Sequence, residues 1–123
     1  MQLEVGMFVR TKQGEIHKIK SINNEFIEYE NGFGVPYEQK DYIVNANYNP
    51  KNLVEIGDYV DGYLVNEVYR PDGNEVFRIE IERCTLRGHI IDYYSPIKSI
   101  VTKEQFESMA YKVNEWKHTR KEL

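Results

Sequence analysis

The sequence predicts a mainly β protein: two related small curled antiparallel sheets or SH3-like barrels, with one C-terminal α-helix. The first observation is a duplicated phrase, because residues 3–9 and 54–60 both read apolar, Glu, β-branched, Gly, any residue, aromatic, Val. The second is a series of alternating apolar and polar runs separated by turn dipeptides. The third is a single capping box near the C-terminus. Since each copy of the phrase leads into a turn and a β-rich run, two copies indicate two related β-modules.

The length and composition indicate one domain, or two very small modules that share a core. The chain has 123 residues, of which 41% are hydrophobic and 13% aromatic, which is enough for a packed core. We expect a first β-module over residues 1–52 and a second, with the helix, over residues 53–123, forming one compact unit. The boundary is placed in the polar, Asn-rich stretch 45–52.

Four segments of the first module alternate as strands do. Gln13-Gly14 and Asn31-Gly32 mark turns between them, and Asn-Gly is the dipeptide most typical of tight hairpins. Asn23-Asn24 marks a further tight connection, and Gly34 belongs to the loop that begins at Asn31. The expected strands are residues 7–11, 15–22, 25–30 and 42–46.

The second module repeats this pattern, with a clear turn over residues 70–74 that contains Pro, Asp and Gly. Its longest alternating run is 75–84, where Ile79 and Ile81 point to one face and Arg78 and Glu80 to the other. We expect the charged face of this run to meet solvent or a partner. The expected strands are residues 63–69, 75–84, 89–94 and 97–101.

A helix is expected to begin at Thr102, because Thr102 and Gln105 have the spacing of a capping box. Apolar residues then recur at helical spacing and would cover one open end of the sheet. In the alternative, the helix stops near Met109 and residues 111–113 add a final strand. The apolar stripe comprises Phe106, Met109, Ala110, Val113 and Trp116.

The charge is unevenly distributed along the chain. Residues 1–82 carry 8 basic and 15 acidic side chains, a net charge of −7, whereas residues 83–123 carry 8 basic and 5 acidic side chains, a net charge of +3. The overall charge of −4 argues against a non-specific DNA-binding protein, which would carry a basic excess. The acidic two-thirds would instead suit a basic protein surface.

No residue pattern indicates catalysis, a cofactor or a metal site, and we expect a non-enzymatic protein. The single cysteine, Cys84, excludes an internal disulfide and any multi-cysteine metal site. The three histidines, His17, His89 and His118, are far apart in the sequence. No apolar run approaches the length of a membrane span, and the first residues do not resemble a signal peptide. We therefore expect a cytoplasmic protein with no membrane partner.

Direct nucleic-acid binding is an alternative for the second module. Small β-barrels bind nucleic acids through aromatic residues interleaved with basic residues on one face. A cluster of this composition lies near the start of the basic third, although Glu80, Glu82 and Asp92 interrupt it. The candidate residues are Arg83, Arg87, His89, Tyr93, Tyr94 and Lys98.

Three phrases of the chain resemble a loose family of small phage and prophage proteins from low-GC Gram-positive bacteria. They are residues 5–12 with Gly14 and Ile16, residues 55–60 with Gly62, Tyr63 and Val65, and residues 100–107. The resemblance implies a bacterial host cell and a gene carried by a mobile element. It further implies an accessory protein that binds and blocks a host defence component, as anti-CRISPR proteins do. A structural or assembly role in the phage is the remaining alternative.

If the chain is such an inhibitor, its acidic segment would compete for a groove that normally holds nucleic acid. A CRISPR effector is the most concrete host partner, and Tyr side chains would supply the anchors of the interface. The candidate partner-binding residues are Glu28, Tyr29, Glu30, Tyr37, Glu38, Asp58, Asp61, Glu80 and Glu82.

Overall fold

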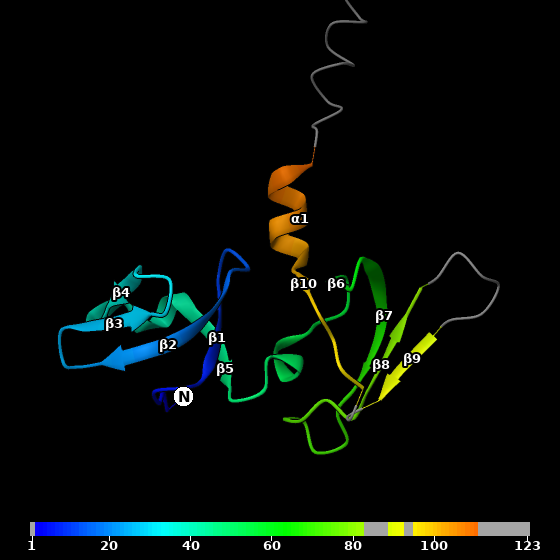
Figure 1. Cartoon of the computed structure of the whole chain (residues 1–123), viewed down its shortest axis with the longest axis horizontal. Coiled ribbons are helices and arrows are strands. Elements are labelled where there is room, and N and C mark those ends of the chain that lie inside the picture. Colours follow the sequence, from blue (N-terminus) through cyan, green and yellow to red (C-terminus); the bar gives the residue numbers. More distant parts are fainter. Residues whose placement is uncertain (1, 83–88, 93–94, 111–123) are drawn as a thin grey trace, which may run out of the picture.

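The computed structural model describes residues 2–82, 89–92 and 95–110. Within these residues the chain forms ten β-strands, two 3₁₀ helices and one α-helix (Figure 1). The strands make two five-stranded antiparallel sheets, one from each half of the sequence. The predicted mainly β fold with a C-terminal helix is therefore confirmed.

The first sheet has the strand order β4-β3-β2-β1-β5. Its four longer strands match the segments expected from alternation, whereas β4 and the 3₁₀ helix η1 were not predicted. The elements are β1 (Phe8–Thr11), β2 (Ile16–Ile22), β3 (Phe26–Tyr29), β4 (Gly34–Pro36), η1 (Tyr37–Tyr42) and β5 (Ile43–Asn47).

The second sheet has the order β10-β6-β7-β8-β9. The strand expected at 75–84 is shorter in the structure, because β8 begins only at Arg78. Val76 is buried and Phe77 is exposed, which is the reverse of what the alternation of the expected strand predicts. The elements are β6 (Tyr59–Val60), β7 (Tyr63–Tyr69), β8 (Arg78–Ile81), β9 (His89–Asp92) and β10 (Ile100–Val101).

The two sheets have the same topology. When the strands are counted within each half, both orders become four-three-two-one-five, with the last strand beside the first. Each second strand also carries a register shift at the same place, between Ile19 and Ser21 in β2 and between Val65 and Glu67 in β7. The duplicated phrase therefore opens two copies of one β-meander. Among the described residues neither sheet closes into a barrel, since the outermost strands of each order do not pair.

Each sheet has its own core, formed mainly by branched apolar residues. The inward positions of the strands supply most of it, as the period-two alternation requires. The core of the first sheet contains Val9, Ile19, Ile27, Tyr29, Val35 and Ile43. The core of the second contains Val54, Val60, Val65, Val76, Ile79, Ile81 and Ile91.

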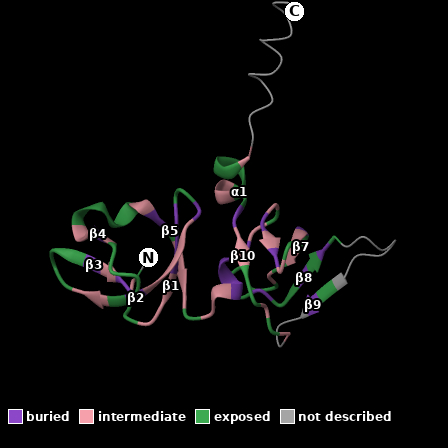
Figure 2. Ribbon diagram, turned by 45° about the horizontal axis from the view of Figure 1, so that its top comes forward, coloured by how far each residue is buried: buried purple, intermediate pink, exposed green. Residues whose placement is uncertain are grey.

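The segment that connects the sheets is packed between them, although its composition predicts a polar loop. It contains the 3₁₀ helix η2 (Pro50–Leu53), in which Lys51, Asn52 and Leu53 are all buried. The Asn52 side chain accepts a hydrogen bond from the Val76 backbone N–H at 2.7 Å. Figure 2 shows buried residues in this connection as well as in both sheets. A polar segment can be buried here because its side chains satisfy neighbouring backbone groups.

The C-terminal helix α1 (Lys103–Met109) begins with the predicted capping box, formed by Thr102 and Gln105. It ends at Met109, because the backbone of Ala110 is extended. The expectation that its apolar stripe covers a sheet is wrong for the described residues: Phe106 stacks on Tyr59 but stays 47% exposed, and Met109 is 70% exposed. The helix stands between the two sheets and projects away from them (Figure 1). The stripe residues Val113 and Trp116, and the alternative strand at 111–113, lie outside the described residues.

Candidate functional site

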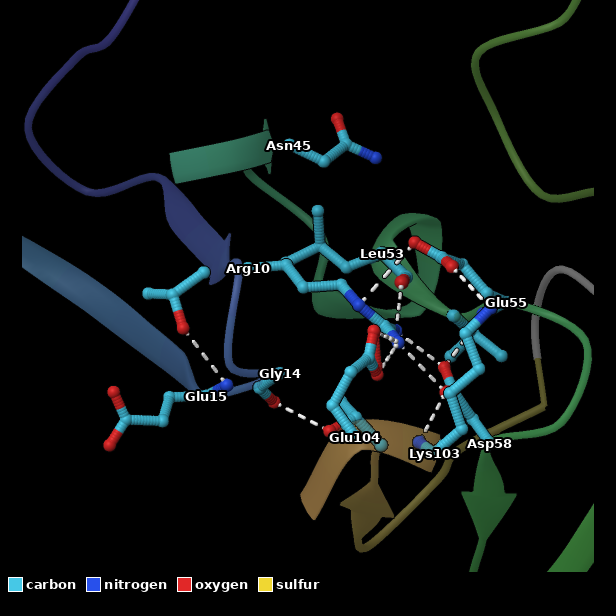
Figure 3. A network of polar contacts seen from close by, with 12 residues as sticks. Arg10, Gly14, Glu15, Asn45, Leu53, Glu55, Asp58, Lys103 and Glu104 are labelled. Carbon is cyan, nitrogen blue, oxygen red and sulfur yellow. Dashed lines mark hydrogen bonds and ion pairs between the residues drawn. The ribbon is translucent and has the colours of Figure 1, made fainter. Parts of the chain in front are cut away.

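Within the described part of the chain, Arg10 has the largest set of side-chain polar contacts, and it lies on β1 between the two sheets (Figure 3). Its side chain is completely buried. The guanidinium donates two parallel hydrogen bonds to the carboxylate of Asp58, at 2.5 and 2.9 Å, and a third to the backbone carbonyl of Leu53 at 2.9 Å. Such a bidentate arrangement is the strongest form of an arginine–carboxylate contact.

Asp58 is also completely buried, and its carboxylate accepts two further hydrogen bonds. The backbone N–H of Glu55 donates to it at 2.7 Å and that of Lys103 at 2.9 Å. One carboxylate therefore ties together β1 of the first sheet, the segment before β6 and the first residue of α1. Four donors compensate the cost of removing this charge from water.

Two more carboxylates complete the cluster around Arg10. Glu104 accepts from the guanidinium at 2.8 and 3.1 Å, and Glu55 lies 3.4 Å from its Nε. Lys103 donates to Glu55 at 2.8 Å, and this hydrogen bond is the main reason why the pKa of Lys103 is raised. Burial by itself lowers the pKa of Arg10, but the hydrogen bond to Asp58 and the surrounding negative charges outweigh it and raise that pKa.

We assign this cluster a structural role as the joint between the modules. Its charged groups form hydrogen bonds and ion pairs with one another and with the backbone of the same protein. Asp58, a candidate partner-binding residue, is therefore unavailable at the surface. Asp61, another candidate, is also used internally, because its carboxylate accepts hydrogen bonds from the backbone N–H groups of Lys98 and Ser99 at 2.7 and 2.9 Å.

The candidate residues of the first sheet are not brought together on one open surface. Tyr29 is 4% exposed, and its ring stacks on that of His17 at 4.5 Å. Glu28 is half-buried and accepts a hydrogen bond from the Ser21 hydroxyl at 3.1 Å. Neither side chain therefore projects from the sheet as a fully exposed anchor in this conformation.

Three other candidates of this sheet are more accessible. Glu30 is exposed and lies 3.8 Å from the Lys18 ammonium. Glu38 is exposed on η1, and the half-buried ring of Tyr37 lies beneath Lys40, with 4.7 Å between the ammonium and the ring centroid. These residues form individual contacts with solvent or with neighbouring lysines.

Glu80, by contrast, lies on the outer side of β8 and is exposed, as alternation predicts. Glu82 is also exposed, but it follows the end of β8 at Ile81. Glu80 belongs to a depression of about 330 Å³ on the outside of the second sheet. The Tyr69 ring is 47% exposed there, with the Arg78 guanidinium 5.3 Å from its centroid. We name this surface the acidic sheet face and define it by Glu67, Tyr69, Arg78, Glu80 and Ile90.

Sequence reasoning missed Glu67, which lies directly opposite Glu80 in the pairing of β7 with β8. Both side chains are exposed, and neither makes an ion pair with the residues that the structure describes. In the first sheet the equivalent cross-strand pair is Ser21 with Glu28, which form a hydrogen bond. The second sheet thus replaces a bonded pair by two like charges.

The alternative nucleic-acid-binding residues are described only in part. Arg83, Arg87, Tyr93 and Tyr94 lie outside the described residues, and of His89 the structure describes the backbone at the start of β9. Lys98 is exposed and lines a pocket of about 300 Å³ together with Lys18 and Phe8 of the first module.

Among residues 2–82, 89–92 and 95–110, no group of three or more His, Cys, Asp or Glu side chains is placed to hold a metal ion. Within the same residues, no helix has the length and apolar character needed to cross a bilayer. No protein-family model, curated protein or solved structure matches this chain. The function must therefore be argued from the surfaces of the molecule itself.

Proposed function

We propose that this chain is a non-enzymatic accessory protein of a phage or mobile element, which binds and blocks a host defence component in the bacterial cytoplasm. A CRISPR effector is the most concrete candidate partner. The surface that we assign to the partner is the acidic sheet face. The observation that carries this assignment is the cross-strand pairing of Glu67 with Glu80, two exposed like charges that make no ion pair with the described residues.

Like charges directly opposite each other on neighbouring strands destabilise a sheet by a few tenths of a kcal/mol or more. A lysine or arginine from a partner would relieve that repulsion, whereas solvent and salt only screen it. The electrostatic energy of this surface in the free protein therefore falls when a basic group binds to it. The basic groove of a nucleic-acid-binding effector offers groups of this kind.

Apolar side chains around the acidic sheet face supply the second component of a protein interface. Tyr69 and Phe77 contact each other edge to face with 6.1 Å between the ring centroids, and they are 47% and 55% exposed. Ile90, 51% exposed, lies beside Glu80 on the next strand. Aromatic residues are enriched in protein interfaces, and tyrosine is among the residues enriched at binding hot spots.

The phage and host-defence part of the proposal is supported by the resemblance of the three sequence phrases. The net charge of −7 over residues 1–82 supports it further, because such a field steers association with a basic partner. Binding that depends on this steering weakens as the salt concentration rises.

The deciding experiment is a pull-down with the tagged full chain from a lysate of a defence-competent host, at low and moderate salt. We expect a host defence protein to bind the wild type and the control variant Glu25→Gln/Asp41→Asn, but not Glu67→Gln/Glu80→Gln. Both double variants lose two exposed negative charges, so only the position of the charges differs. Recovery of no host protein, together with unimpaired defence in cells that express the chain, would refute the proposal.

Nucleic-acid binding is retained as a second candidate because Lys18 and Lys98, which are 80 positions apart, line one pocket with Phe8. A protein of this kind should shift a labelled single strand by itself, with an affinity that falls steeply as salt rises. Lys98→Glu should weaken such a shift, whereas Glu67→Gln/Glu80→Gln should not. A defence inhibitor would give no shift alone.

A further inference from the structure

A second pocket lies on the first module, where β2 and β3 meet η1. Its volume is about 370 Å³. None of its lining residues belongs to the acidic sheet face or to the ion cluster around Arg10. The lining residues that matter here are Glu15, His17, Tyr29, Phe33, Gln39 and Tyr42.

Aromatic rings form much of the wall of this pocket. His17 and Tyr29 are stacked with an interplanar angle of 10°, and Tyr42 follows at the end of η1. Phe33, in the turn between β3 and β4, is 75% exposed and is therefore held at the rim with little packing of its own. Ring faces attract cations through their quadrupole, and they stack well with planar groups.

Glu15 supplies the charge of the pocket. It is the only Asp, Glu, Lys or Arg among the described residues that line it, and its side chain is 47% exposed. Its nearest basic neighbour is the Nε2 of His17 at 3.7 Å, which compensates the carboxylate only when the imidazole is protonated. The side-chain amides of Asn31 and Gln39 add further polar atoms to the lining.

One polar group in the wall is unsatisfied by the described residues. The hydroxyl of Tyr29 is buried and makes no hydrogen bond with them. Burial, followed by the nearby Glu15 and Tyr42, raises the pKa of Tyr29, so this hydroxyl is neutral at physiological pH. Native proteins keep few such groups, and those that remain call for an explanation.

We propose that this pocket binds the guanidinium group of an arginine side chain presented by a partner protein. The guanidinium is planar and permanently charged, so it can stack on the aromatic wall while it donates to the Glu15 carboxylate. An anion would be repelled by Glu15, and an apolar group would bury that carboxylate without compensation. The inference goes beyond the proposed function, because it assigns a separate site that does not involve the acidic sheet face.

The test is an NMR titration of the full chain with three blocked tripeptides, acetyl-Gly-X-Gly-amide, in which X is arginine, citrulline or lysine. We expect the arginine peptide to shift the signals of His17, Phe33 and Tyr42 in a saturable way. Citrulline, which has the same shape without the charge, should give little change. Lysine, which lacks the planar group, should bind more weakly than arginine.

Two variants locate the effect in the pocket. Glu15→Gln should weaken arginine binding about tenfold or more, because it removes a charge-assisted hydrogen bond. Phe33→Ala removes an exposed ring without disturbing the core and should also weaken binding. Glu25→Gln, an equal change of charge at an exposed position outside the pocket, should have no effect. Equal responses to arginine and citrulline, equal responses to arginine and lysine, or unchanged binding in Glu15→Gln would overturn the proposal.

Discussion

Arg10 and Asp58 form a buried bidentate ion pair between two copies of one repeat, yet neither residue is repeated. When residues 3–9 are aligned with residues 54–60, Asp58 corresponds to Met7, and the position of Arg10 corresponds to Asp61. The joint between the modules therefore depends on positions at which the two copies differ. It is a specific feature of the pair and does not follow from the duplicated pattern.

The first prediction concerns this pair. Arg10→Met should lower the free energy of unfolding by about 3–5 kcal/mol, because it leaves the buried carboxylate of Asp58 without its main partner. Asp58→Asn should have a similar effect. Urea denaturation followed by circular dichroism measures both changes. As a control, Glu30→Gln removes an exposed ion pair with Lys18 and should lower the free energy of unfolding by less than about 1 kcal/mol. An equally small loss in Arg10→Met would show that the ion cluster does not stabilise the fold.

The second prediction concerns the first residue of the capping box. The Thr102 hydroxyl is buried, donates to the Gly14 carbonyl at 2.7 Å and accepts from the Gln105 N–H at 3.3 Å. Thr102→Ala should cost about 2–3 kcal/mol, since it removes the cap and leaves a buried carbonyl unpaired. Thermal unfolding should show a clear drop in the midpoint. Ser108→Ala, which removes an exposed hydroxyl from the same helix, should leave the midpoint nearly unchanged.

The third prediction compares two glycines that have the same backbone conformation. Gly14 and Gly32 have φ values of +83° and +90°, so alanine is strained by about 1–2 kcal/mol at either position. A Cβ at Gly14 would also lie 2.2 Å from the Thr102 hydroxyl oxygen, whereas a Cβ at Gly32 would meet nothing within 4 Å. Gly14→Ala should therefore be more destabilising than Gly32→Ala by at least about 1 kcal/mol in urea denaturation. Equal losses would contradict the close packing of the β1–β2 turn against α1.

The fourth prediction uses the buried hydroxyl of Tyr29. Because this hydroxyl has no partner among the described residues, Tyr29→Phe should leave the stability unchanged or raise it by about 1 kcal/mol. Chemical denaturation measures the change directly. A loss of stability of more than about 1 kcal/mol would mean that the Tyr29 hydroxyl is hydrogen-bonded in solution. Tyr42→Phe is the matched control, because it removes a neighbouring hydroxyl.

Alternation predicts most strands because each sheet has one buried face, so residues such as Ile79 and Ile81 have to recur at every second position. It misses β4, since Gly34, Val35 and Pro36 are too few to alternate and proline argues against a strand. This strand tolerates proline because it lies at the edge of its sheet.

The sites are predicted less well than the strands. The exposure of Glu80 follows from its own strand, but its position opposite Glu67 depends on the register shift within β7, which no local pattern encodes. From the sequence, Asp58 is predicted only as a partner-binding candidate, and Arg10 is given no role beyond the expected strand 7–11. Their burial arises only when the modules pack together, and for that reason the ion cluster was not predicted.

Because the two copies differ at the positions of Arg10 and Asp58, a first module should pair with a second module and not with another first module. Two first modules facing each other would place Arg10 against Met7, and two second modules would place Asp58 against Asp61, so neither symmetric arrangement can form the buried pair. A chain divided within the connecting segment should therefore reassociate only from one half of each kind. The differences at these two aligned positions thus favour pairing of unlike halves over pairing of like halves, because only the unlike pair places Arg10 opposite Asp58.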